Sequence, residues 1–165
     1  DRLQDPGNLG TLFRTALASD IEEVWMALGA DPLGQKVLRA SSGAVLRLPY
    51  KRFSTCESQA TASLAKRLQS YADKGYQVVS THVPNDSLSN SIIPYWELDW
   101  TKPTISVLGN EGSGLSPTIN APCTHGVTLP HSPAVESLNV SAAAVPLLLE
   151  RQRVKMISKQ FSNGE

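Results

Sequence analysis

The feature of this 165-residue chain that most limits its fold is a regular alternation of short apolar runs with amphipathic segments. The apolar runs have the length and composition of buried strands: EVWMAL (23–28), AVLRLP (44–49), YQVVST (76–81), PTISVLG (103–109) and GVTLP (126–130). Helical periodicity is found over 8–19, 36–42 and 58–74, and from about 137 onward. This alternation predicts an α/β fold, in which a mostly parallel sheet carries helices on both faces.

Local signals set the ends of several elements. Asn8 is the predicted N-cap of the first helix, because the apolar periodicity starts directly after it. Gly75 is expected to end the third helix, and the Ser/Asn/Pro-rich stretch up to Asn90 to form a flexible loop. Pro146 is expected to bend the last helix. Only RLQ precedes the first Pro-Gly turn, so a core strand at this point either extends upstream of Asp1 or is truncated.

The length and composition indicate one globular domain over residues 1–165. Hydrophobic residues make up 41% of the chain and charged residues 18%, which argues against disorder. No apolar run is long enough to span a membrane and no signal peptide opens the chain, so we expect a soluble intracellular protein of the cytoplasm or an organelle matrix. Cys56 and Cys123 lie far apart, and neither a disulfide framework nor a metal site is expected.

The charges balance overall but are not evenly spread. The formal net charge is zero, which gives no global sign of a nucleic-acid partner. Between Pro32 and Cys56, however, there is no acidic residue and there are five basic ones: Lys36, Arg39, Arg47, Lys51 and Arg52. This segment is either an ordinary solvated face or an edge that contacts phosphates.

The sequence GNEGSGLS (109–116), directly after a predicted strand, has the appearance of a phosphate-binding loop. Leu115 stands at the position where such a loop needs its lysine, so the main side-chain partner of a triphosphate is missing. The dinucleotide pattern G-x-G-x-x-G is absent as well. The stretch is therefore a glycine-rich turn from strand to helix that suits another ligand, and a nucleotide-binding hydrolase is disfavoured.

Three segments with unusual polar residues lie at predicted strand ends: DPGNLGTLFRTA (5–16), LGNEGSGLS (108–116) and LPHSPAVESLNVSAAA (129–144). Their order and separation resemble motifs one, two and three of the SpoU, or TrmH-like, class of SPOUT RNA methyltransferases. The resemblance implies methyl transfer from S-adenosylmethionine to a ribose 2′-hydroxyl of RNA. It also implies a homodimer and a trefoil knot in the C-terminal part.

The resemblance and the chemistry of the cofactor indicate the same binding segments. S-adenosylmethionine carries no phosphate, and its adenine edge can be read by closely approaching backbone, which glycine permits. Ser137 has a second interpretation as the N-cap of the last helix. The residues expected to bind the cofactor are Leu108, Gly109, Asn110, Gly112, Leu129, Ser137 and Leu138.

The expected catalytic residues are Arg14, Asn8, Glu111 and Asn139. Arg14 corresponds to the catalytic arginine of the family, and its high pKa favours a role as a phosphate clamp that stabilises alkoxide charge over a role as a base. Without the other motifs it would be an ordinary surface arginine. Glu111 is expected to orient Arg14 or to accept hydrogen bonds from Asn8, the alternative being an acid at a helix N-terminus.

The RNA substrate is expected to be ribosomal RNA, with transfer RNA as the alternative. A second alternative is a non-catalytic SPOUT-fold module that binds RNA. Pro133 stands where the third motif usually has glycine, so the rim of that loop differs from the family pattern. The apolar stretch LNVSAAAVPLLL (138–149) is consistent with a buried homodimer interface.

Overall fold

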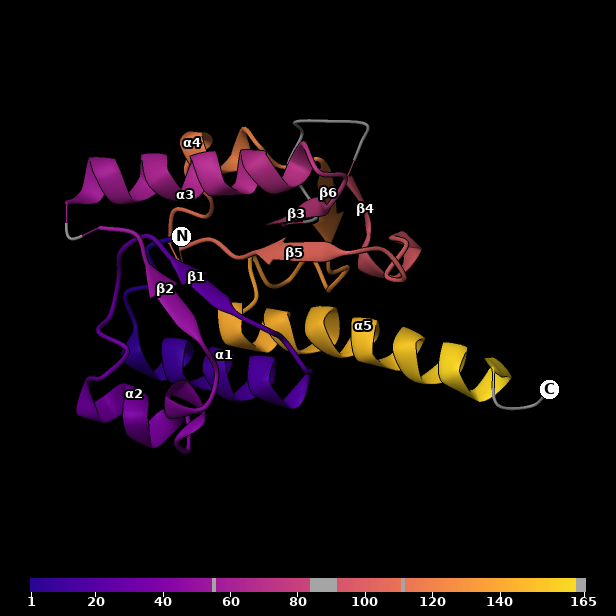
Figure 1. Ribbon diagram of the computed structural model, residues 1–165, viewed down its shortest axis with the longest axis horizontal. Helices are drawn as coiled ribbons and strands as arrows, with labels where there is room; N and C mark the ends of the chain where they lie inside the picture. The colour runs from indigo at the N-terminus through magenta and orange to yellow at the C-terminus, as the bar shows by residue number, and fades with distance from the viewer. Residues whose placement is uncertain (55, 84–91, 111, 163–165) are drawn as a thin grey trace.

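Two parallel sheets form the centre of the computed structural model (Figure 1), which describes residues 1–54, 56–83, 92–110 and 112–162. In the first sheet, β1 (Val24–Met26) pairs with β2 (Tyr50–Arg52). The second sheet has the order β4–β6–β3–β5. Its strands are β3 (Gln77–His82), β4 (Ile92–Pro94), β5 (Thr104–Val107) and β6 (His125–Thr128). Every pairing is parallel, which confirms the predicted α/β class.

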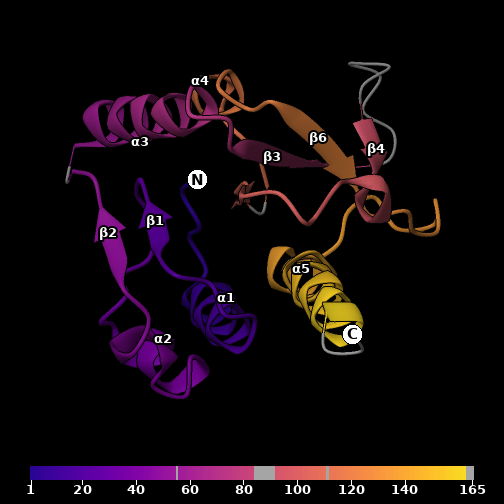
Figure 2. The same cartoon turned by 45° about the vertical axis from the view of Figure 1, so that its right-hand side comes forward.

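Helices cover both faces of the four-stranded sheet (Figure 2). On one face, Val78 packs with Leu64 and Leu68, whose inward orientation the sequence predicts. On the other face, Val79 packs with Leu147, because successive side chains of a strand point to opposite sides. The helices are α1 (Pro6–Ala18), α2 (Gln35–Ala40), α3 (Glu57–Ala72), α4 (Pro117–Asn120) and α5 (Val140–Ser162), with 3₁₀ helices η1 (Ala44–Leu46) and η2 (Tyr95–Glu97).

The strand predicted over 44–49 is wrong. Gly43 has φ +79, in the left-handed region, and turns the chain into η1. The amide of Leu48 then donates to the carbonyl of Ala44. Ala44, Val45 and Leu48 are buried and Leu46 is exposed, which is the spacing of a helical turn. The strand follows at Tyr50–Arg52.

Two helix starts also differ from the prediction. The N-cap of α1 is Asp5, whose side chain accepts a hydrogen bond from the backbone amide of Asn8 at 2.8 Å. Asp5 precedes Pro6, and proline is favoured in the first turn of a helix. The last helix starts at Val140, so Ser137 is not its cap. Pro146 lies inside this helix. The stretch predicted to be a flexible loop falls largely on residues 84–91, outside the described residues.

None of the helices in the described part of the chain is long and apolar enough to span a membrane.

Candidate functional site

Two of the three polar segments leave the four-stranded sheet at the carboxyl ends of its strands. All four strands are parallel, so the carboxyl ends of β5 and β6 lie on either side of the end of β3. Leu108 follows β5 and Leu129 follows β6, and both pack against the same apolar cluster around Val79 and Val127. In open α/β sheets ligands bind beyond this end of the strands.

The first and third segments meet through Asn8 and Asn139. The Nδ2 of Asn139 donates to the Oδ1 of Asn8 at 2.9 Å, across a separation of 131 residues. The Oγ of Ser141 lies 3.3 Å from the same oxygen. Both asparagines are among the residues expected at the site from the sequence, and the structure brings them together. Ser141 is not among the expected residues, although it closes the motif VESLNVS.

Asn139 also caps α5. Its Oδ1 accepts hydrogen bonds from the backbone amides of Ser141 at 2.9 Å and Ala142 at 3.2 Å. The Oγ of Ser141 donates to the same oxygen at 2.6 Å. One end of the Asn139 amide therefore fixes the start of α5, while the other end holds Asn8. The relative position of α1 and α5 is tied to the geometry of these two side chains.

The backbone of Asn8 is fixed from the other side by Asp5. The bond from the amide of Asn8 is the main cause that holds the pKa of the Asp5 carboxyl below its ordinary value, and Lys36 at 3.4 Å lowers it further. This role of Asp5 is not among the sequence-based expectations. The signal was present, since an Asp directly before a proline is a typical helix start.

The glycine loop, residues 108–116, is closed by two backbone hydrogen bonds between Asn110 and Gly114, of 2.9 and 3.0 Å. A Cβ on Gly109 would lie 2.4 Å from the carbonyl carbon of Gly114, so only glycine allows this approach of the two backbones. The Oδ1 of Asn110 accepts from the amides of Gly112 and Ser113, at 2.9 and 3.1 Å. The side chain of Asn110 thus binds backbone amides within its own loop and stabilises the turn.

Residues 1–2 anchor the same loop. The backbone nitrogen of Asp1 donates to the carbonyl of Leu108 at 2.8 Å, and the Asp1 carboxylate accepts from the amide of Ser116 at 2.8 Å. The Nδ2 of Asn110 donates to the carbonyl of Arg2, also at 2.8 Å. Both ends of the glycine loop are therefore held by Asp1, whose side chain is fully buried. Nothing in the sequence pattern pointed to Asp1 or Arg2 as partners of the loop.

Three other residues expected at the site are less constrained. A Cβ on Gly112 would meet only the Oδ1 of Asn110, at 3.7 Å, so the structure does not require glycine there. Ser137 and Leu138 are exposed in the segment that leads into α5. Among the described residues, no hydrogen bond joins either of them to the glycine loop. Glu111 lies outside the described residues.

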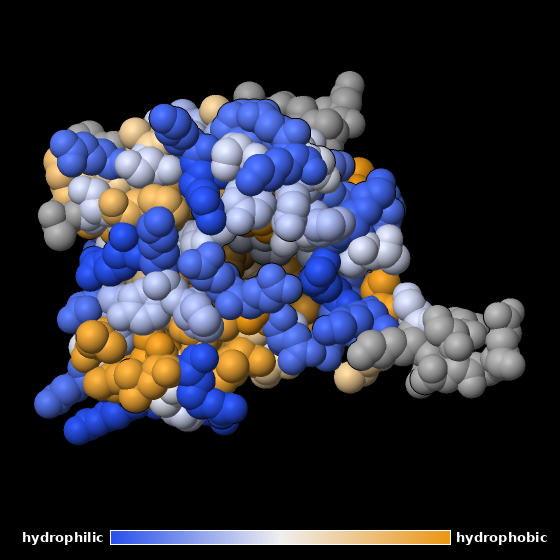
Figure 3. Space-filling view, viewed as in Figure 1, coloured by the Kyte–Doolittle hydropathy of each residue, from blue (hydrophilic) through white to orange (hydrophobic). Residues whose placement is uncertain are grey.

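Arg14 is exposed on α1, six residues and about 9 Å along the helix axis from Asn8. Its Nη1 donates to the Oγ of Ser42 at 3.2 Å, which places it beside α2. The five basic residues between Pro32 and Cys56 are all exposed. Hydrophilic side chains project over α2 at the lower left of Figure 3. Two of the five are paired with acids, Lys36 with Asp5 and Arg52 with Asp31.

Two buried hydroxyl oxygens, Oγ of Ser116 and Oγ1 of Thr128, have no hydrogen-bond partner among the described residues. Ser116 ends the glycine loop and Thr128 ends β6, so both lie next to the expected ligand segments. No cluster of His, Cys, Asp and Glu in the described part of the chain has the composition to hold a metal ion. A glycine-rich backbone, two apolar side chains and two hydroxyls suit an uncharged ring system with hydrogen-bonding edges better than a phosphate.

Comparison with known proteins gives consistent matches over nearly the whole chain. A model of the SpoU rRNA Methylase family matches residues 1–148. An uncharacterized tRNA/rRNA methyltransferase of Synechocystis sp. is 41% identical over 154 residues, which are 93% of this chain and 51% of that protein. The chain spans about half the length of the curated relatives it matches.

Solved structures of methyltransferases are also similar to this chain over most of its length. The SpoU methyltransferase AviRb of Streptomyces viridochromogenes, in complex with the cofactor AdoMet, is 26% identical, with a TM-score of 0.77 over 94% of this chain and 58% of that one. An RNA 2′-O ribose methyltransferase is 29% identical, with a TM-score of 0.72 over 93% of this chain and 54% of the other.

Proposed function

This chain belongs to the SpoU rRNA methylase family, and from that membership we propose that residues 1–165 form the catalytic domain of an S-adenosylmethionine-dependent RNA methyltransferase. The acceptor is the 2′-hydroxyl of a ribose, and the RNA is ribosomal. The observation that carries the proposal is the hydrogen bond between Asn8 and Asn139, because it joins the first and third motifs at the sheet end where the glycine loop lies. The 2′-O ribose methyltransferase among the similar structures supports the choice of acceptor.

The cofactor would be held by the glycine loop and the segment after β6. Gly109 lets the backbone of the loop close tightly, and Leu108 and Leu129 offer apolar surface on the same cluster. The buried hydroxyls of Ser116 and Thr128 are available as hydrogen-bond partners. When bound, S-adenosylmethionine supplies a methyl group that its sulfonium has already activated. Asn110, Gly112, Ser137 and Leu138 complete the proposed binding set.

The residues of the chain then have to orient the acceptor and manage one proton. A ribose hydroxyl is a poor nucleophile until its proton leaves, and we propose that this proton passes to water as the methyl group is transferred. We assign Asn8 and Asn139 to positioning the hydroxyl, because their amide groups are already fixed to each other. Arg14 contacts a phosphate of the RNA and stabilises the developing alkoxide, since a guanidinium stays charged and offers a planar pair of donors. Glu111 is proposed to orient Arg14.

The exposed basic side chains around α2 are proposed to contact the RNA backbone. Arg39 and Arg47 are exposed and lie on the same part of the chain as Ser42, the partner of Arg14. Phosphate contacts by Lys and Arg supply affinity that does not depend on sequence. This face therefore positions the RNA but does not select the nucleotide.

A homodimer is also proposed. The outer side of α5 exposes Val145 by 38%, Leu149 by 42% and Met156 by 56%, and Leu138 in front of the helix is exposed by 40%. A stripe of this kind on a long helix is typical of an interface with a second copy. The trefoil knot of the C-terminal part stays a prediction from the resemblance.

The experiment that tests the substrate class is a map of 2′-O-methylated nucleotides in the RNA of cells with and without the gene. We expect one position in ribosomal RNA to lose its methyl group when the gene is deleted. Loss confined to transfer RNA would replace the substrate but keep the reaction. No change in either RNA, together with normal expression of the protein, would favour a non-catalytic RNA-binding module.

A further inference from the structure

Helices α1 and α2 lie side by side and run in the same direction. Their starts are joined by the ion pair between Lys36 and Asp5, whose charged atoms lie 3.4 Å apart. Their ends are joined by the hydrogen bond of 3.2 Å from Arg14 to Ser42. Between these points, a Cβ on Gly10 would lie only 2.6 Å from a Cβ of α2, so glycine allows the two helices to approach closely.

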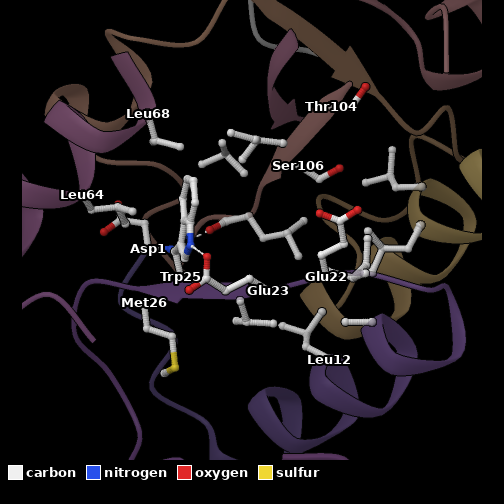
Figure 4. Close-up of a pocket in the computed structure, with 18 of the residues that line it drawn as sticks. Asp1, Leu12, Glu22, Glu23, Trp25, Met26, Leu64, Leu68, Thr104 and Ser106 are labelled. Atoms are coloured by element: carbon white, nitrogen blue, oxygen red, sulfur yellow. Dashed lines mark hydrogen bonds between the residues drawn. The ribbon is translucent and has the colours of Figure 1, made fainter. Parts of the chain in front are cut away.

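The solvent-facing side of α1 carries small residues beside α2. Thr11 and Arg14 are exposed and lie on one side of the helix, because residues three apart are neighbours on its surface. Gly7 belongs to the same side, four residues before Thr11. Leu12 is turned the other way, toward the interior, as Figure 4 shows. We call the strip formed by Gly7, Thr11, Arg14 and Lys36 the α1/α2 surface.

Two cations stand at the two ends of this surface. The Cε of Lys36 lies 3.8 Å from the position that a Cβ on Gly7 would take. Arg14 is seven residues further along α1, which is a rise of about 10 Å. Residues 7–13 contain no Asp or Glu. Two separated cations with small uncharged residues between them complement a chain of phosphates and leave room for it.

Asp5 is the acid that pairs with Lys36, and this pair can exchange its partner. The side chain of Lys36 is 68% exposed and that of Asp5 is 47% exposed, and ion pairs between exposed side chains contribute little to stability. The carboxylate of Asp5 also accepts a hydrogen bond from the amide of Asn8 at 2.8 Å and lies at the positive end of α1. Lys36 can therefore turn to a phosphate while Asp5 stays in place as the helix cap.

We propose that Lys36 and Arg14 bind two phosphates of one RNA strand, which lies along the α1/α2 surface. The inference rests on the proposed function, in which Arg14 contacts a phosphate. It adds Lys36 as a second phosphate ligand and, with it, the line along which the strand crosses the two helices.

Lys36 also links the bound strand to the proposed acceptor site. It contacts Asp5, and Asp5 fixes the backbone of Asn8 in the first turn of α1. Asn8 in turn accepts the hydrogen bond from Asn139. A phosphate on Lys36 therefore lies beside the turn that carries Asn8, and Lys36 acts as a positioning residue for the ribose.

The salt dependence of RNA binding tests the inference without any activity measurement. The probe is a short fluorescein-labelled single-stranded RNA of mixed sequence, and its anisotropy gives the affinity at several NaCl concentrations. Each phosphate contact to a single strand contributes about 0.7 to the slope of log affinity against log salt concentration. We expect Lys36→Met and Arg14→Met each to weaken binding and to reduce this slope by about 0.7, and the double substitution to reduce it by about 1.4.

Two further variants are the controls. Lys36→Arg keeps the positive charge and should keep the slope. Lys74→Met removes an exposed lysine that lies just before β3, at the end of the sheet opposite to the glycine loop, and should leave the slope unchanged. Thermal unfolding checks that the variants are folded, which we expect because the substituted side chains are exposed.

The possible failures are distinguishable. If the natural protein binds RNA but Lys36→Met or Arg14→Met leaves the slope unchanged, the inference is overturned and the proposed function stands. An equal loss of slope with Lys74→Met would show diffuse attraction in place of a defined surface, and would also overturn the inference. If the folded natural protein does not bind RNA at all, the proposed function fails and the inference fails with it.

Discussion

At the scale of single residues, substitutions of Gly109 and Gly112 distinguish a glycine that the loop backbone requires from one that it does not require. Gly109→Ala would put a Cβ 2.4 Å from the backbone of Gly114, so we expect the loop to open and binding of S-adenosylmethionine to be lost. Gly112→Ala leaves 3.7 Å to the nearest atom and should fold normally. Calorimetry with S-adenosylmethionine measures cofactor binding by the two variants, and thermal unfolding measures their stability. Normal binding by Gly109→Ala would contradict the assigned role of the loop.

Arg14 is the residue at which the catalytic and the ordinary surface interpretations differ most. If Arg14 stabilises alkoxide charge, Arg14→Ala should slow single-turnover methyl transfer by roughly a hundredfold or more while cofactor affinity stays within a few fold. Arg14→Lys should not restore the rate fully, because an ammonium lacks the planar pair of donors. Ser42→Ala, which removes only the hydrogen-bond partner of Arg14, is the control. Near-normal transfer by Arg14→Ala would mean that Arg14 is an ordinary surface residue with no part in the reaction.

Residues named by a motif could be listed from the sequence, whereas contacts that depend on the fold could not. Asn8 and Asn139 were both expected at the site, and they are hydrogen-bonded to each other. The N-cap was predicted at Asn8, where the apolar periodicity starts, whereas the cap is Asp5, directly before Pro6. Asp1 could not be found, since its partners Leu108 and Ser116 lie more than a hundred residues away.

At the scale of elements, the start of α5 links stability to the site. Asn139→Ala removes the acceptor that caps α5, so we expect a loss of about 1 kcal/mol in the free energy of unfolding, which corresponds to roughly 2–4 °C in Tm. Asn139→Ser keeps a capping oxygen but is too short to reach Asn8. It should retain most of the stability and lose methyl transfer.

Thermal unfolding and single-turnover transfer for the two Asn139 variants separate these roles. If Asn139→Ser loses stability as Asn139→Ala does and yet transfers normally, the side chain is only a helix cap. If both variants keep the stability of the natural protein, the capping bonds to Ser141 and Ala142 contribute nothing measurable.

Elements were predictable where periodicity was unambiguous. The helix over 58–74 and the strands around 76–81 and 103–109 agree with α3, β3 and β5 within a few residues. The stretch AVLRLP has apolar residues that suit either a short strand or a helical turn. Gly43 and the hydrogen bonds that follow it decide for the turn, and composition alone does not show them.

At the scale of the whole molecule, the exposed apolar stripe of α5 tests the homodimer. Leu149→Glu puts a charge on this stripe, so we expect a shift from dimer to monomer in analytical ultracentrifugation. Leu46→Glu changes a side chain that is 70% exposed elsewhere on the molecule and serves as the control. A natural protein that stays monomeric at all concentrations would contradict the dimer.

The parallel arrangement of the strands followed from the alternation of elements, but the order of the strands did not. The insertion of β6 between β3 and β4, and the separation of β1 and β2 from the other strands, depend on long-range packing. The candidate site is outlined by three motifs, each of which follows a strand or starts a helix.

The position of the methyl group in the product tests the proposed reaction most directly. The protein is incubated with S-adenosylmethionine labelled in its methyl group and with ribosomal and transfer RNA in separate reactions, and the RNA is then digested to nucleosides. We expect the label in a 2′-O-methylated nucleoside from ribosomal RNA, and its loss with Arg14→Ala. Label on a base, or no transfer to either RNA by protein that is folded and binds the cofactor, would contradict the assignment as a ribose methyltransferase.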